Sequence, residues 1–255
     1  MITLISPAKT LDFERDISCN EYSIPENLDK SEQLVGTLKR KSRKQLSELM
    51  NISPKLAGLN HDRFQEWNIP FTMDNARQAV FVFKGDVYAG LDIDRFLLED
   101  LKYTQDHLRI LSGLHGMLRP LDLIKPYRLE MGIRLKYRRK NNLYEFWGDT
   151  ITNQLKETLE PEGSGILVNL ASDEYFKSID TKKLGARIIT PVFMDFKNGE
   201  YKLISFFFKK ARGMMARYIL LNRIEDAEQL KMFDEEGYMY NDQLSEGDRL
   251  VFTRG

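Results

Sequence analysis

The stretch Arg187–Phe208, RIITPVFMDFKNGEYKLISFFF, decides the fold class. Its two apolar runs, Arg187–Phe196 and Tyr201–Phe208, have the composition of strands. The turn Lys197–Glu200 between them contains Asn-Gly, a strong short signal of a β-hairpin. We therefore predict an antiparallel hairpin here. Such a hairpin, among strands and helices that alternate along the chain, favours a mixed α/β (α+β) protein over a strictly doubly wound parallel sheet.

Outward from the hairpin, the spacing of apolar residues predicts the other elements. Strands are predicted at Ile2–Ile5, at the end of Asn75–Phe83 and at Ile166–Leu170. Helices are predicted at Ser31–Met50, at Phe96–Leu111, from Ser172 to Phe176, and around Ala211–Ile219. The chain contains no internal repeat and no low-complexity linker.

Composition excludes several classes of protein. Hydrophobic residues make up 42% and charged residues 30% of the chain, as in ordinary globular proteins. No apolar run approaches the ~20 residues of a membrane helix, and no secretory leader is visible. Cys19 is the single cysteine, which precludes an intrachain disulfide and fits the cytoplasm. We expect no cofactor and no metal, because glycine-rich nucleotide loops and zinc-ligand spacings are absent.

The net charge is zero, but the charge is sorted along the chain. Residues 107–140 carry nine basic residues against two acids, a net charge of +7. Residues 201–223 carry six basic residues and no acid, whereas residues 224–248 carry nine acids and one lysine. Charge gathered in this way creates a field that attracts polyanions.

Two segments suit nucleic acid in particular. In Leu108–Pro120, the pair Gly113 and Gly116 is typical of a hairpin whose backbone N–H groups hold a DNA phosphate. The following segment, Pro126–Gly132 running into Arg134–Lys140, interleaves cations with Tyr127 and Tyr137 and suits phosphate contacts with base stacking. A third basic group, Lys209, Lys210 and Arg212, lies at the start of a predicted helix, where a bound anion would relieve the unfavourable dipole.

An enzyme is the alternative. Polar residues follow several predicted strands, and strand ends often hold ligands. If they converge, they form a pocket for a nucleotide or a damaged base, with Asp86 or Glu174 as general base. The residues concerned are Ser6, Lys9, Lys84, Asp86, Asn169, Ser172 and Glu174; the candidates for catalysis are Lys9, Lys84, Asp86 and Glu174. Direct iron sequestration is a third alternative, through carboxylates alone.

Several motifs together resemble the YaaA family of peroxide-stress proteins. They are ISPAKTLDF, FKGDVYAGL, HLRILSGLHGMLRPLDLIKPYRLEMG, YEFWGD, VNLASDEYFKS and ISFFFKKARGMMARYI, which span the chain from Met1 to about Phe252. His115 stands where the family usually has tyrosine. The resemblance implies a cytosolic protein of the hydrogen peroxide response that helps to limit iron-dependent damage to DNA.

The resemblance also implies a single domain over residues 1–255, with a family-specific fold, a helix-hairpin-helix element and a basic cleft that binds DNA, duplex or single-stranded, with little sequence specificity. Carried over to this chain, the hairpin comprises Ser112, Gly113, Leu114, His115 and Gly116. The cleft cations come from Lys9, Lys84, Arg109, Arg119, Arg128, Lys209, Lys210 and Arg212. We expect no membrane partner, because no apolar run is long enough for a membrane helix.

Overall fold

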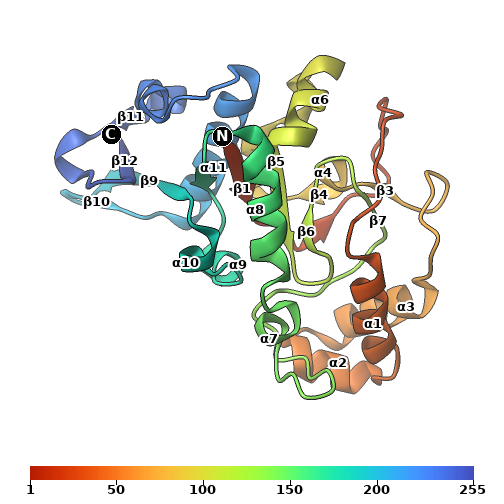
Figure 1. Cartoon of the computed structure of the whole chain (residues 1–255). Helices are drawn as coiled ribbons and strands as arrows, with labels where there is room; N and C mark the ends of the chain where they lie inside the picture. Colours follow the sequence, from red (N-terminus) through yellow and green to blue (C-terminus); the bar gives the residue numbers. More distant parts are fainter.

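A mixed sheet runs through the middle of the molecule (Figure 1). Its strands lie in the order β11-β12-β9-β8-β1-β5-β6, with β10 paired to β9. The neighbours from β12 to β5 are parallel, whereas β11, β10 and β6 pair antiparallel. The computed structural model describes residues 1–255 and confirms the predicted mixed α/β class.

The strands are β1 (Ile2–Ile5), β2 (Thr10–Leu11), β3 (Arg77–Gln78), β4 (Phe83–Lys84), β5 (Leu108–Ser112), β6 (Gly116–Leu118), β7 (Leu123–Ile124), β8 (Ile166–Asn169), β9 (Arg187–Lys197), β10 (Glu200–Lys202), β11 (Met239–Tyr240) and β12 (Arg249–Arg254). The α-helices are α1 (Leu28–Lys39), α2 (Arg43–Met50), α3 (Pro54–Glu66), α4 (Ala79–Val82), α5 (Asp86–Leu91), α6 (Leu98–His107), α7 (Leu143–Trp147), α8 (Thr150–Glu162), α9 (Asp173–Phe176), α10 (Thr181–Leu184) and α11 (Ser205–Leu221).

β1 lies in the interior of the sheet, between β8 and β5. Every side chain of Ile2–Ile5 is buried, as in parallel strands covered on both sides. β8 and β5 flank it in parallel, and each adds apolar side chains to the same core. A single cluster of buried apolar residues extends from Met1 to Phe252, so both halves of the chain share one core.

The helices form two groups. α8 packs against β1 and β6, and α11 packs against β9, α5 and α6. α1, α2, α3 and α7 gather at the end of the molecule opposite to β9–β12 (Figure 1, lower right). α5 and α11 touch through glycine: a Cβ on Gly213 would lie 1.8 Å from the Val87 carbonyl oxygen, and one on Gly90 would lie 2.0 Å from that of Lys210.

The predicted helix over Phe96–Leu111 is wrong in its last part. α6 ends at His107, and Leu108–Ser112 is a buried strand beside β1. β5 then turns back into β6, so Leu108–Leu118 forms a β-hairpin and not the hairpin of a helix-hairpin-helix element. Backbone pairing with β1, for example of Leu108 with Thr3, outweighs the local helical pattern.

Three other predictions need correction. Ser31–Met50 is two helices, because Ser42 forms a capping box with Gln45 and starts α2. Asn75–Phe83 divides into β3, α4 and the start of β4. The predicted hairpin at Lys197–Glu200 is confirmed, but its second strand ends at Lys202, and Ser205–Phe208 is the first turn of α11. Ile2–Ile5, Ile166–Asn169 and the helix after Ser172 are confirmed.

Candidate functional site

A tight turn presents two arginines next to the N-terminal helices. Tyr137 and Lys140 exchange two backbone hydrogen bonds of 2.9 Å each. Arg138 and Arg139 form the tip, and Arg138 has a positive φ of 51°. Glycine or asparagine usually occupies such a position because other side chains are strained there. Backbone strain of this kind persists mainly at functional sites, where a side chain must be held in a fixed direction.

The turn and helix α1 enclose a groove of about 410 Å³, which we call the basic-turn groove. It is lined by Lys30, Gln33, Tyr137, Arg138, Arg139, Lys140 and Phe146. Four of these seven residues are cations and none is an acid. Arg138, Arg139 and Lys140 are exposed, and none of them pairs with a carboxylate.

Aromatic side chains stiffen this groove. The Tyr137 hydroxyl donates to Gln33 Oε1 at 2.8 Å, which ties the turn to α1. Phe146 packs edge-on against the Tyr137 ring, with centroids 5.2 Å apart. The Arg138 guanidinium lies over the Tyr137 ring, 5.4 Å from its centroid. The groove therefore combines cations with aromatic rings, as sites for single-stranded nucleic acid do.

A second basic segment, at the end of α1, was missed by sequence reasoning. The junction between α1 and α2 reads Lys39-Arg-Lys-Ser-Arg-Lys44, five cations in six residues. Only Arg43 forms an ion pair, with Asp62 at 3.0 Å. The density of cations in this short segment is the signal that could have revealed it. None of these five cations lines the basic-turn groove.

The predicted hairpin residues are buried rather than presented to a partner. Ser112 hydrogen-bonds the Tyr127 hydroxyl at 2.6 Å, and His115 Nδ1 lies 2.9 Å from the Ser31 hydroxyl. Burial lowers the pKa of His115 to about 3, so its ring is neutral. Gly113 and Gly116 are buried, and a Cβ on them would collide with the Leu129 carbonyl oxygen and with the Trp147 ring. These residues lie in the core, and their contact with DNA stays a prediction.

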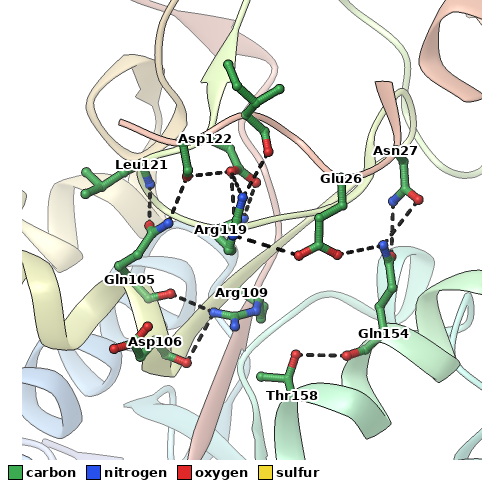
Figure 2. Close-up of polar contacts among 12 residues, drawn as sticks. Glu26, Asn27, Gln105, Asp106, Arg109, Arg119, Leu121, Asp122, Gln154 and Thr158 are labelled. Atoms are coloured by element: carbon green, nitrogen blue, oxygen red, sulfur yellow. Dashed lines mark hydrogen bonds and ion pairs between the residues drawn. The ribbon is translucent and has the colours of Figure 1, made fainter. Parts of the chain in front are cut away.

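Arg109 and Arg119, also predicted to bind DNA, bond within the protein (Figure 2). Arg109 is 8% exposed, and its guanidinium donates to the carbonyl oxygens of Gln105, Asp106 and Leu108. Arg119 binds buried Asp122 through Nε at 3.1 Å and Nη2 at 2.9 Å. Burial is the first cause that lowers the pKa of Arg109, followed by the charge of Arg119.

These arginines border a cleft of about 870 Å³ at the amino ends of β1 and β5, which we call the amino-edge cleft. Arg109 lines it, and Arg119 reaches Glu26 at its rim, 3.9 Å away (Figure 2). The cleft also contains five carboxylates, from Glu26, Asp106, Glu157, Glu162 and Glu225. This negative lining repels a polyanion, so Arg109 and Arg119 are poorly placed to hold DNA.

The cations of α11 point in different directions. Lys209 is exposed, Lys210 pairs with Glu236, and Arg212 is half-buried with its guanidinium over the Phe208 ring. Burial lowers the pKa of Arg212, and Asp173 opposes this shift. Only Lys209 is fully available to a ligand, and it does not line the basic-turn groove.

The second candidate site lies where β1 and β8 end. β1 and β8 are neighbours in the main sheet. The next strand of that sheet after β1 in the sequence, β5, lies on one side of this pair, and the next strand after β8, β9, lies on the other. Ligands of parallel sheets bind at such points, outside the carboxyl ends of the strands. Here Ser6 Oγ accepts from the Ser172 backbone N–H at 2.9 Å and lies 3.3 Å from the Ser172 hydroxyl. Asn169 is buried and caps the turn by accepting from Ala171 N–H.

Further polar side chains lie next to Ser6 and Ser172. We call the whole set the carboxyl-edge site; it consists of Ser6, Lys9, Arg128, Glu130, Ser172 and Glu174. Arg128 donates to Glu130 Oε1 through Nε at 3.1 Å and Nη2 at 2.7 Å. Lys9 Nζ lies 3.6 Å from the same oxygen. Glu174 Oε1 accepts from Gly132 N–H at 2.9 Å and so holds the Arg128–Gly132 segment against α9. Sequence reasoning missed Glu130, although it is one of only two acids in the basic segment 107–140.

The remaining predicted residues lie beside this site. Lys84 pairs with Asp12 at 2.9 Å, and this bond is the first cause of the lowered pKa of Asp12. Asp86 opens α5 and is half-buried. The structure thus brings together Ser6, Lys9, Asn169, Ser172 and Glu174, while Lys84 and Asp86 lie on the adjoining β4–α5 segment.

Comparison with protein families agrees with this architecture and with the motifs. The family model described as peroxide stress protein YaaA matches residues 1–244. The chain belongs to the YaaA family. The resemblance drawn from the motifs is thereby confirmed, and with it a role in the response to peroxide stress.

Two observations on this YaaA family member bear on metals and membranes. Its His, Cys, Asp and Glu side chains form no group of three or more that could hold a metal ion. None of its helices combines the length and the hydropathy of a membrane-crossing segment.

Proposed function

We propose that this YaaA family member binds DNA in the basic-turn groove as part of the cytoplasmic response to peroxide stress. One observation carries the proposal: four cations and two aromatic rings line a groove of about 410 Å³ that contains no acid. Arg138, whose backbone is strained, and its neighbour Arg139 are both exposed and add to it. Unpaired cations at a concave surface favour a polyanion with a repeating charge.

The groove supports backbone contacts more than reading of base sequence. Arginine and lysine bind phosphate oxygens without regard to the base attached. The half-buried rings of Tyr137 and Phe146 line the groove, and stacking on an aromatic ring does not depend on which base is present. We therefore expect binding to duplex and single-stranded DNA, with weak sequence preference and a steep dependence on salt, because released counterions drive it.

Binding of this kind also provides a route to protection from iron. DNA phosphates hold a condensed layer of cations, and protein cations displace that layer. Ferrous ions next to the backbone would be displaced in the same way, so that hydroxyl radicals form farther from the DNA. The link to iron itself rests on the resemblance to the family.

The test is the affinity for a labelled 20-base-pair duplex and for the corresponding single strand, followed by fluorescence anisotropy at low salt. Arg138→Ala/Arg139→Ala should weaken binding by at least about tenfold, the cost of roughly 1.4 kcal/mol. The control, Lys197→Ala/Lys209→Ala, also removes two exposed cations without ion pairs and should change the affinity less than about threefold. A larger loss in the control would overturn the placement, and no binding by the wild type would overturn the function.

An enzyme that acts on a nucleotide or a damaged base is a second candidate. The observation in its favour is the convergence of Ser6, Lys9 and Glu174, with Asn169 and Ser172, on the point between β1 and β8 where parallel sheets bind ligands. Incubation of the protein with nucleotides and with oligonucleotides that carry oxidised bases, followed by chromatography, tests this candidate. No product after prolonged incubation would count against it.

A further inference from the structure

Arg109 has a free edge at the amino-edge cleft. It is the only arginine among the buried residues, and its three hydrogen bonds to carbonyl oxygens all come from Nη1. In Figure 2 the dashed lines from Arg109 run only to Gln105 and Asp106. Its Nε and Nη2 have no partner in the protein, and neither nitrogen is completely buried, so a ligand atom can reach both.

Two other arginines of the protein show what such an edge binds. Arg119 uses Nε and Nη2 to hold Asp122, at 3.1 and 2.9 Å. Arg128 uses the same two nitrogens to hold Glu130, at 3.1 and 2.7 Å. Nε and Nη2 form one side of the planar guanidinium, and their parallel N–H bonds match a carboxylate. The free edge of Arg109 therefore suits a carboxylate from outside the protein.

The rest of the cleft suits cations. Five carboxylates line it, and two of them, Glu26 and Glu162, already pair with a cation of the protein. The other three are exposed and have no ion pair: Asp106, Glu157 and Glu225. A ligand that carries only a carboxylate would be repelled by this excess of negative charge. The ligand must therefore combine a carboxylate with cationic groups.

We propose that the amino-edge cleft binds a basic amino acid. Its α-carboxylate pairs with Nε and Nη2 of Arg109, and its α-ammonium group and cationic side chain face the three unpaired carboxylates. The volume of about 870 Å³ leaves room for a neighbouring residue, so the amino acid is either free or the last residue of a peptide. The cleft shares no lining residue with the basic-turn groove, and this inference goes beyond the proposed binding of DNA.

Calorimetric titration at low salt tests the contact between the carboxylate and Arg109. Arginine and argininamide differ only at the carboxyl group, so the comparison leaves the buried Arg109 unchanged. Arginine should bind about tenfold or more tightly, although the amide has the greater positive charge, because the amide loses the charged, bidentate pair. Equal or tighter binding of the amide, or no binding of arginine at millimolar concentrations, would overturn the proposal.

Citrulline tests the cationic side chain of the ligand. It keeps the α-carboxylate and the α-ammonium group of arginine but has a neutral urea group in place of the guanidinium. Its affinity should be lower than that of arginine by about threefold or more, because an exposed carboxylate of the cleft loses its partner. Equal affinities for arginine and citrulline would contradict the role of the carboxylates.

Two matched double variants locate the ligand. Asp106→Asn/Glu157→Gln removes one unpaired lining carboxylate from α6 and one from α8, and should weaken arginine binding about fivefold or more. Glu99→Gln/Glu160→Gln removes one exposed carboxylate from each of the same helices outside the cleft, and should keep the affinity within about twofold. Equal effects of the two variants, both folded by circular dichroism, would overturn the placement in the cleft.

Two further titrations separate the sources of the ligand and the two sites. Tighter binding of the dipeptide alanyl-arginine than of arginine would assign the cleft to peptide ends, and weaker binding would assign it to the free amino acid. Arg138→Ala/Arg139→Ala should bind arginine as wild type does, whatever its affinity for DNA. A loss of arginine binding in that variant would contradict the proposed cleft, whereas a loss of DNA binding alone leaves it supported.

Discussion

Tyr137 and Lys140 exchange both of their backbone hydrogen bonds, N–H to carbonyl oxygen in each direction at 2.9 Å. This exchange leaves Arg138 and Arg139 as the two-residue tip of a closed turn. The Tyr137 hydroxyl, bonded to Gln33, fixes the turn to α1. Two cations are thereby held beside the groove, with less entropy to lose when they meet phosphate than flexible side chains would have.

The first prediction concerns protection of DNA. Wild-type protein should slow the nicking of supercoiled plasmid by ferrous ion and hydrogen peroxide several-fold, because bound cations displace iron from the backbone. Arg138→Ala/Arg139→Ala should give little protection at the same concentration. Gel electrophoresis measures the nicked fraction. Equal protection by both proteins would show that scavenging, and not DNA binding, is responsible.

The second prediction concerns Arg119, which was expected from the resemblance to contact DNA. Arg119→Ala should lower the free energy of unfolding by about 2 kcal/mol, because Asp122 is 1% exposed and loses its charged donor. The affinity of the folded variant for DNA should stay within about twofold of wild type. Urea denaturation and anisotropy measure the two quantities. A tenfold loss of affinity would show that Arg119 contacts DNA.

The third prediction concerns pH and His115. The folded chain keeps this ring neutral with a pKa of about 3, while the unfolded chain binds a proton near pH 6.5. The stabilisation is therefore complete above pH 6.5 and is lost as the pH falls toward 3. Between pH 7 and pH 5, wild type should lose about 2 kcal/mol more than His115→Gln. Urea denaturation at both values measures this; parallel losses would show that His115 is protonated in the folded state.

The fourth prediction compares two helix glycines. Gly213→Ala places a methyl group against the Val87 carbonyl of α5 and should destabilise the protein by about 3 kcal/mol. Gly36→Ala, on α1, meets nothing within 4 Å and should be neutral or stabilise by about 0.5–1 kcal/mol. Thermal denaturation compares the two variants. Similar effects at both positions would mean that α5 and α11 do not pack closely.

The sequence predicts those parts of the fold in which local pattern and tertiary structure agree. β1, β8 and the Asn-Gly turn have clear local signals and are found as predicted. β5 was predicted to be helical because Leu108–Leu111 continues the helical pattern of the preceding residues. Its strand conformation comes from pairing with Thr3–Ile5, and one sequence does not reveal such distant pairing.

For the candidate sites too, the sequence predicts only the parts that have a local signal. The basic run Arg134–Lys140 could be recognised from its composition, but its partners Lys30 and Gln33 lie more than 100 residues earlier in the chain. Ser6 and Ser172 were predicted at strand ends, and the strand order then places them side by side. Glu130 has no local signal of burial, because it becomes buried only when Arg128 and Lys9 meet it.

The measurement that tests the central claim most directly is the salt dependence of duplex binding. For wild type, the logarithm of the association constant should fall steeply and linearly with the logarithm of salt concentration. For Arg138→Ala/Arg139→Ala, that slope should be shallower by about 2, because two phosphate contacts are lost at roughly 0.9 each. Parallel lines for the two proteins, or a flat line for wild type, would contradict DNA binding through the basic turn.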